Sequence, residues 1–152
     1  MSIDTYDTRA IIRPGVGGPY NLDYIEGLAR NVAGSSGTAV VRKPAFPDGE
    51  YVSLTKNGIE LSIYYSDEPW VAGECEDIAE HSGGGCRGST RWFSLHGTDL
   101  DLVLVNDHES ICERLRTTGD FVFYSSQNGC CSRTRLSAPA PMEPITREQP
   151  PL

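Results

Sequence analysis

The chain has 152 residues, of which 38% are hydrophobic, and it carries a formal net charge of −8 at pH 7. This length suffices for one domain that buries roughly two thirds of its unfolded surface, so folding requires neither a metal nor a disulfide. The acidic charge argues against nucleic acid as the main partner, because binding to phosphates needs a basic surface. No apolar run is long enough to span a membrane, and the first residues lack the apolar core of a signal peptide. These features favour a cytoplasmic or virion location and leave secretion as the alternative.

The N-terminal third is expected to contain an arm followed by a helix. Residues 1–19 are predicted to form an extended arm, because residues 14–19 contain only proline, glycine and one valine. Asn21 is a suitable N-cap, and apolar residues recur at helical spacing from there to Gly34. The sequence therefore predicts a first helix that begins after Asn21 and ends near Gly34.

Strands dominate the next part of the chain. Residues 38–43 are expected to form a short strand that stops at Pro44. Residues 51–55 and 59–65 predict a hairpin, because Lys56-Asn57-Gly58 can adopt the positive φ angles of a tight turn. In the second of these strands apolar and polar residues alternate, as in an antiparallel pair with one buried face.

The second half is expected to contain both helices and strands, without strict alternation. The predicted helices are 74–81 and 108–116, the latter capped by Asn106 and Asp107, and the predicted strands are 90–95, 100–105, 120–125 and 130–136. Hairpins outnumber strand–helix–strand units in this order. The fold class is therefore α+β, with a mostly antiparallel sheet built from hairpins, two or three short helices on one face, and a single domain over residues 20–136.

Residues 137–152 contain five of the ten prolines and are expected to form an extended C-terminal arm. Such an arm can adopt a polyproline conformation against a neighbouring subunit. Pro139, Pro141 and Pro144 are therefore candidate contact residues.

All five cysteines lie in the second half of the chain, at Cys75, Cys86, Cys112, Cys130 and Cys131. They are either thiols in a reducing compartment or disulfides with one cysteine left over. Cys75, His81 and Cys86, with Cys130 and Cys131, could in principle supply the four ligands of a tetrahedral zinc site, but the paired C-x-x-C motifs of structural zinc sites are missing. The sequence therefore assigns no metal site.

Two other groups of residues have side chains that could carry chemistry. His108 and Cys112 are four positions apart on one predicted helix face, as a thiolate–imidazolium pair would require, but Ile111 and Leu115 on that face indicate a core position. Acidic residues that could hold a hard cation lie between 99 and 109, without the pattern of an EF-hand loop. No nucleotide-binding or serine-hydrolase motif occurs. The sequence assigns no catalytic residue and no cofactor.

Aromatic residues flank an acidic run and suggest a contact surface. Residues 67–80 contain six acidic residues and no basic one, and Tyr65, Trp70 and Trp92 lie close to this run in the sequence. An exposed aromatic ring beside carboxylates is suited to binding another protein. These three residues are the candidate interaction residues of the domain.

Residues 70–131 resemble the small killer-toxin and necrosis-effector domains of fungi. In those families a cysteine-bearing helix leads through a glycine turn and a cysteine-bearing strand to a second helix and a closing strand that ends near a cysteine. The matching segments here are 72–79 with Cys75, then Gly85-Cys86, then the helix with Ile111 and Leu115, and finally Gly129-Cys130. The resemblance covers less than half of the chain and implies a secreted, disulfide-bonded domain.

Three functional hypotheses follow from the sequence. The leading one is a non-enzymatic structural or interaction protein, such as a self-assembling viral subunit whose terminal arms contact neighbouring copies. Its partner would be a protein, most simply a second copy of the chain. The alternatives are a secreted domain of the toxin or effector type and a small cysteine- or metal-dependent hydrolase.

Overall fold

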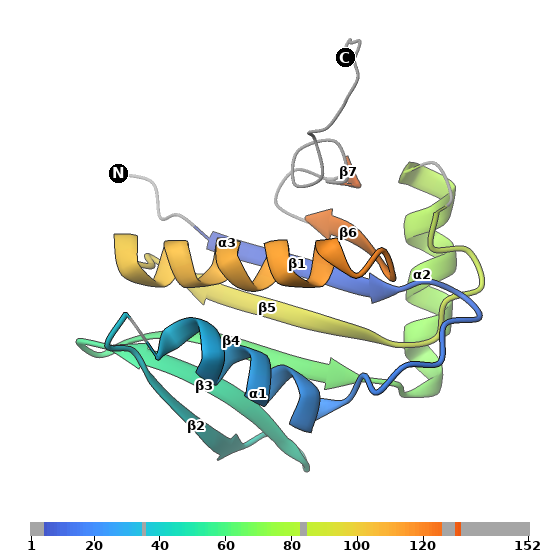
Figure 1. Cartoon of the computed structure of the whole chain (residues 1–152). Helices are drawn as coiled ribbons and strands as arrows, with labels where there is room; N and C mark the ends of the chain where they lie inside the picture. The colour runs from blue at the N-terminus through green and yellow to red at the C-terminus, as the bar shows by residue number, and fades with distance from the viewer. Residues whose placement is uncertain (1–4, 35, 83–84, 126–129, 132–152) are drawn as a thin grey trace, which may run out of the picture.

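The computed structural model describes residues 5–34, 36–82, 85–125 and 130–131 (Figure 1). The strands are β1 (Thr5–Ile12), β2 (Ala39–Pro44), β3 (Glu50–Lys56), β4 (Ile59–Ser66), β5 (Trp92–Thr98), β6 (Phe121–Ser125) and β7 (Cys130–Cys131), and the helices are α1 (Leu22–Ala33), α2 (Pro69–Ser82) and α3 (Leu102–Thr117). The fold is α+β, as the sequence predicts.

The strands form one antiparallel sheet in the order β2-β3-β4-β5-β1-β6-β7. β1 lies in the interior of this sheet, where it pairs with β5 on one side and with β6 on the other. The N-terminal segment is thus extended, as expected, but residues 5–12 belong to the sheet rather than to an arm outside it. The local sequence shows only an apolar pair at Ile11 and Ile12, whereas the neighbouring strands supply the burial.

The β3–β4 hairpin confirms the local turn signal. Asn57 has a φ of 54° and Gly58 a φ of 80°, which is the backbone that a two-residue turn between antiparallel strands needs. Val52 pairs with Ile63 and Leu54 with Leu61, so four fully buried side chains line one face of this hairpin.

Helices α1 and α3 cover that same face of the sheet and enclose the main core. Asn21 caps α1, as predicted, by accepting a hydrogen bond from the backbone N–H of Tyr24 at 2.9 Å. The buried residues Ile25 and Ala29 of α1 and Leu104 and Ile111 of α3 pack against the strands. Both helices therefore owe their position to an apolar stripe.

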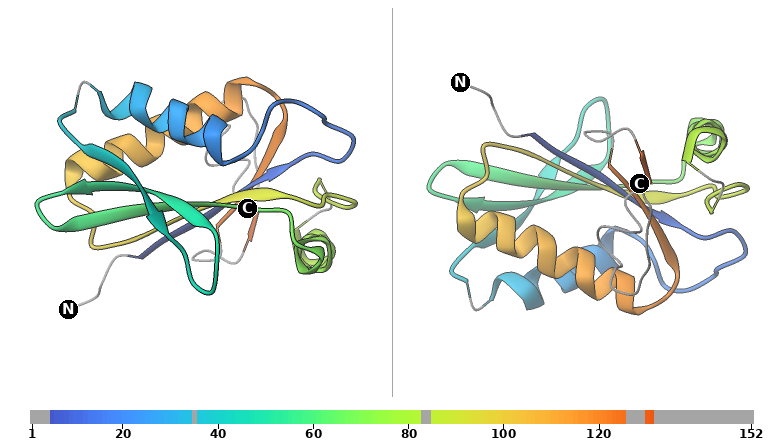
Figure 2. Two further views of the ribbon diagram at one scale, coloured as in Figure 1. Left: turned by 90° about the horizontal axis from the view of Figure 1, so that it is seen from below. Right: turned by 90° about the horizontal axis from the view of Figure 1, so that it is seen from above.

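Helix α2 lies on the opposite face of the sheet (Figure 2), so the expectation that all helices share one face is wrong. Its buried residues Val71, Cys75 and Ala79 pack against side chains that point to that face, chiefly Ile11 and Trp92. This second core is smaller than the first and covers only the end of the sheet where β5 begins. Among the described residues, no other helix lies on this side.

The secondary structure of residues 100–105 differs most from the prediction. They were expected to form a strand because leucines alternate there, but α3 begins at Leu102. The helix is capped by Asp101, whose side chain accepts from the N–H of Leu104 at 2.9 Å, and not by Asn106 and Asp107. The buried stripe of α3 contains Asp107 and His108, and these polar residues conceal its helical period.

The end of the chain is only partly within the described residues. The last predicted strand, 130–136, is present as β7 over residues 130–131, and its other residues lie outside the described part. The predicted C-terminal arm at 137–152, with Pro139, Pro141 and Pro144, lies outside it as well. None of the helices formed by the described residues is long and apolar enough to cross a membrane.

Candidate interaction surface

The three aromatic residues predicted to bind a partner have different environments. Tyr65 points toward the main core, where its ring lies 5.6 Å from that of Phe93. Trp92 is 2% exposed beneath α2 and Arg9, whose guanidinium carbon lies 5.1 Å from the centre of the Trp92 ring. Only Trp70, at the start of α2, is largely exposed, at 56%. The structure therefore leaves Trp70 as the aromatic residue of this set that a partner can reach.

Trp70 is held in place although its ring faces solvent. Its edge contacts the buried Trp92 ring, with 5.8 Å between ring centres and an interplanar angle of 73°. Such an edge-to-face contact restricts the ring. A second exposed ring, that of Phe46, is 98% exposed at the tip of the β2–β3 loop.

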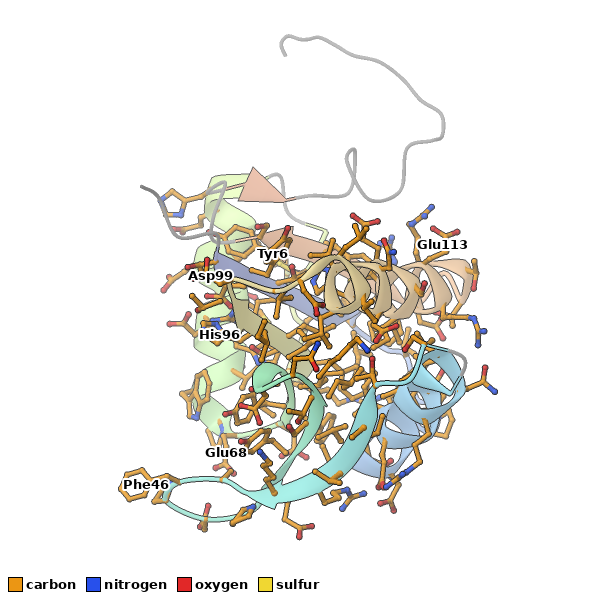
Figure 3. All side chains as sticks on the ribbon, turned by 90° about the vertical axis from the view of Figure 1, so that its left-hand side faces the viewer. Tyr6, Phe46, Glu68, His96, Asp99 and Glu113 are labelled. Carbon is orange, nitrogen blue, oxygen red and sulfur yellow. The ribbon has the colours of Figure 1, made fainter. Side chains whose placement is uncertain are left out.

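Exposed carboxylates lie along α2 and in the turn before it, in the same segment as Trp70. Asp67 and Glu68 precede the helix, and Glu74, Asp77 and Glu80 follow on its solvent side. Figure 3 shows Glu68 on the same side of the sheet as His96, with Glu113 of α3 on the opposite side. We call Trp70 together with Glu74, Asp77 and Glu80 the α2 surface.

Three basic side chains that the structure describes on this side of the sheet are paired with carboxylates. Arg87 binds Glu76 at 3.0 Å and Lys43 binds Glu60 at 3.2 Å, while Arg9 binds Asp7. The acidic residues of the α2 surface are not among these partners. Within the described part of the chain, negative charge is therefore in excess along α2.

The part of the sheet that α2 leaves uncovered is polar and centred on Glu60. Its carboxylate accepts hydrogen bonds from Ser53 at 2.6 Å, Tyr51 at 3.1 Å and Ser62 at 3.1 Å, besides the ion pair with Lys43. Burial alone would raise the pKa of Glu60, but the hydrogen bonds from these partners outweigh it and lower the pKa below its usual value. Glu60 therefore stays ionised and organises this face.

The same face brings a serine, a histidine and an aspartate side by side. Ser62 pairs with His96 across β4 and β5, and His96 pairs with Asp7 across β5 and β1. The hydroxyl of Ser62 donates to Glu60, however, and Asp7 binds Arg9. The serine is thus engaged with a carboxylate rather than activated by the imidazole, and the row does not have the geometry of a nucleophile and its base.

The pair considered for nucleophilic catalysis lies in the main core. Cys112 is 2% exposed and His108 is 5% exposed, with 3.9 Å between the Cys112 sulfur and Nε2 of His108. Burial raises the pKa of Cys112 to about 12 and lowers the pKa of His108 to about 4. Both side chains are therefore neutral at pH 7, which is the opposite of a thiolate–imidazolium pair.

The acidic residues considered for a cation have separate structural roles. Asp101 caps α3, and Asp107 accepts a hydrogen bond from Thr38 at 2.7 Å inside the protein. Asp99 occupies a loop position with a φ of 53°. Within the described ranges, no three His, Cys, Asp or Glu side chains are arranged to hold a metal ion.

A cavity of about 530 Å³ opens between α1 and α3. Asn31 and Arg114 stand on its two walls and are joined by a hydrogen bond of 3.0 Å, and Glu109 and Glu113 complete a polar lining. Two carboxylates and a guanidinium line the space together with a single apolar residue, Val32. The lining therefore selects no particular class of ligand.

Several residues of the uncovered side were missed by sequence reasoning. The rings of Tyr51 and Tyr64 stack 4.8 Å apart on neighbouring strands, and Glu60 lies beside them. In the sequence these residues alternate with apolar ones, and this alternation could have predicted that they share the outward face of the hairpin. Phe46 gave no signal beyond its position between two prolines.

Comparison with protein-family models, curated proteins and solved structures found no match for this chain. The resemblance to killer-toxin and necrosis-effector domains therefore stays a prediction.

Proposed function

We propose that this protein is a non-enzymatic binding module whose α2 surface holds a partner protein with a basic surface. The observation that carries the proposal is Trp70, a large ring that is 56% exposed among exposed carboxylates. Tryptophan contributes more binding energy at protein interfaces than most residues when it enters a pocket on the partner. Its edge contact with Trp92 also limits the side-chain entropy lost on binding.

Charge determines the kind of partner that fits. Glu74, Asp77 and Glu80 repel acidic proteins and nucleic acid, and they attract lysine and arginine side chains. Two copies of the α2 surface would place like charges opposite each other, so self-association through this surface is unfavourable. A different, basic protein is the partner that the surface favours.

The non-enzymatic part of the proposal rests on the buried state of His108 and Cys112. A substrate cannot reach either side chain without opening the main core, and neither is ionised at pH 7. The accessible polar groups around Glu60 satisfy one another and leave no activated nucleophile among the hydroxyls that bind it. Binding is therefore a better match than catalysis to this arrangement.

Self-assembly through the terminal arms is a separate proposal with its own test. Light scattering after size-exclusion chromatography should give the mass of more than one chain for the full protein. The mass of a single chain at high concentration would end this proposal without affecting binding at α2.

The α2 proposal can be tested by photo-crosslinking in cells that make the protein naturally. A photoreactive phenylalanine derivative replaces Trp70 in one variant and Glu113 on α3 in a control variant. The crosslinked protein is then identified by mass spectrometry. We expect a basic protein to be captured from position 70 and not from position 113. Equal capture from both positions, or capture of an acidic protein, would contradict the proposal.

The captured protein is then purified and titrated calorimetrically against two triple variants with the same change in net charge. The first is Glu74→Gln, Asp77→Asn and Glu80→Gln, and the second is Asp23→Asn, Glu109→Gln and Glu113→Gln on the opposite side. The first variant should bind at least about tenfold more weakly, equivalent to about 1.4 kcal/mol. Equal losses in the two variants would show that net charge alone sets the affinity.

A further inference from the structure

The sheet separates the cysteines into two groups. Cys112 is buried in the main core between the sheet and α3, whereas Cys75 and Cys86 are buried in the second core beneath α2. β7, which contains Cys130 and Cys131, pairs with β6 and lies against α2. Of the three cysteines whose side chains the structure describes, two thus lie on the α2 side of the sheet and one on the other side.

Cys75 and Cys86 are in contact although they come from different segments. The thiol of Cys86 donates to the backbone carbonyl oxygen of Cys75, at 3.4 Å, and both residues are fully buried. Both are thiols in this structure. This contact places the sulfur of Cys86 against the main chain of Cys75, inside the second core.

Two polar contacts fix this approach. Glu76, the residue after Cys75, accepts from the N–H of Gly88 at 2.8 Å and binds Arg87 at 3.0 Å. Both donors directly follow Cys86, so the turn is fastened to α2 beside the two thiols. A rigid approach of this kind reduces the rearrangement needed to form a covalent bond.

We propose that Cys75 and Cys86 form a disulfide that joins α2 to the turn before β5, and that Cys112 stays a thiol. The S–H bonds of Cys75 and Cys86 break and one S–S bond forms. The two protons and two electrons that these bonds release are taken up by a low-molecular-weight disulfide such as oxidised glutathione, whose S–S bond breaks to give two thiols. The exchange passes through a mixed disulfide with one of the two cysteines.

Burial decides when this bond can form. Burial, with smaller contributions from the neighbouring Cys86, Glu76 and Glu74, raises the pKa of Cys75 to about 12, so the native thiol is protonated at pH 7. Thiolate is the reactive species, and exchange in the folded protein is therefore slow. The disulfide should form while the chain folds, before α2 closes over the sheet.

The test is to refold the full, reduced chain with excess oxidised glutathione, quench in acid and alkylate the remaining thiols. Residues 57–87 form one tryptic peptide that contains both cysteines, and cleavage after Glu76 and Glu80 separates them unless they are linked. We expect a linked pair of Cys75 and Cys86 and alkylated Cys112. Linkage of either cysteine to Cys130, Cys131 or glutathione, or alkylation of both, would overturn the proposal.

A thermal measurement gives a second, independent readout. The bond closes a 12-residue loop, and the oxidised protein should melt about 5–10 °C above the reduced one. Cys112→Ala should keep this difference between oxidised and reduced protein, and Cys86→Ala should lose it. A difference that survives in Cys86→Ala would assign the stabilising bond to other cysteines and contradict the proposal.

Discussion

His108 makes the stability of this protein depend on pH in a predictable direction. Its imidazole is 5% exposed, Nε2 lies 3.3 Å from the hydroxyl of Thr8, and Nδ1 has no hydrogen-bond partner. The ring of Tyr6 and the thiol of Cys112 complete its surroundings. None of these neighbours carries a charge that could compensate an imidazolium, so burial lowers the pKa of His108 from 6.5 to about 4.

The sign and the size of the effect follow from proton linkage. Between pH 6.5 and 4 the unfolded chain binds a proton at His108 and the native protein does not, so the free energy of unfolding falls as the pH falls. The stability is unaffected by His108 above pH 6.5, and the loss is complete below the native pKa. The difference between the two pKa values corresponds to roughly 3 kcal/mol in total and to about 2 kcal/mol between pH 7 and pH 5.

Urea unfolding at pH 7 and pH 5 measures this difference. The wild-type protein should lose about 2 kcal/mol more than His108→Gln, in which the titrating group is absent. His96→Gln, which alters an exposed histidine on β5, is the matched control and should keep the wild-type loss. Equal losses in the wild type and His108→Gln would refute the reasoning. If His108→Gln does not fold, NMR titration of the native imidazole decides, and a midpoint near 6.5 would refute it.

Two further predictions concern hydrogen-bonded carboxylates. Glu60→Ala leaves the hydroxyls and the ammonium that bind its carboxylate without this partner. The free energy of unfolding, measured in urea, should fall by about 2 kcal/mol. The exposed control Glu68→Ala should change it by less than about 0.5 kcal/mol. Thr38→Val removes the 2.7 Å hydrogen bond to buried Asp107 and should cost about 1–3 kcal/mol in the same assay; an unchanged midpoint would show that Asp107 is satisfied without it.

The sequence determined those elements whose signals lie within a few residues. Asn57 and Gly58 tolerate positive φ, and alternating apolar residues follow them, so the β3–β4 hairpin could be predicted with its turn and its buried face. Asn21 and the apolar stripe after it likewise specified α1. Local backbone preferences and hydrophobic period are enough to predict such elements, because both signals favour the same structure and no competing structure satisfies both.

The strand predicted at 100–105 shows where local signals fail. Alternating leucines have the period of a strand, but the helical stripe from Leu104 to Leu115 includes Asp107 and His108. These two polar residues are buried because Thr38 and Thr8, both distant in the sequence, supply hydrogen bonds. A sequence pattern cannot reveal that a polar residue will find its partner inside the protein, since the partner is brought there by the tertiary fold.

The tertiary structure alone decided which side of the sheet each candidate residue occupies. It buried Trp92 beneath α2 and left Trp70 exposed, although the sequence predicts both as interaction residues. It also placed Cys112 on one side of the sheet and Cys75 with Cys86 on the other. The sequence by itself determined that the domain is acidic and that Trp70 lies within its acidic run. The side of the sheet depends on long-range strand pairing and helix packing, because these contacts join segments that share no local signal.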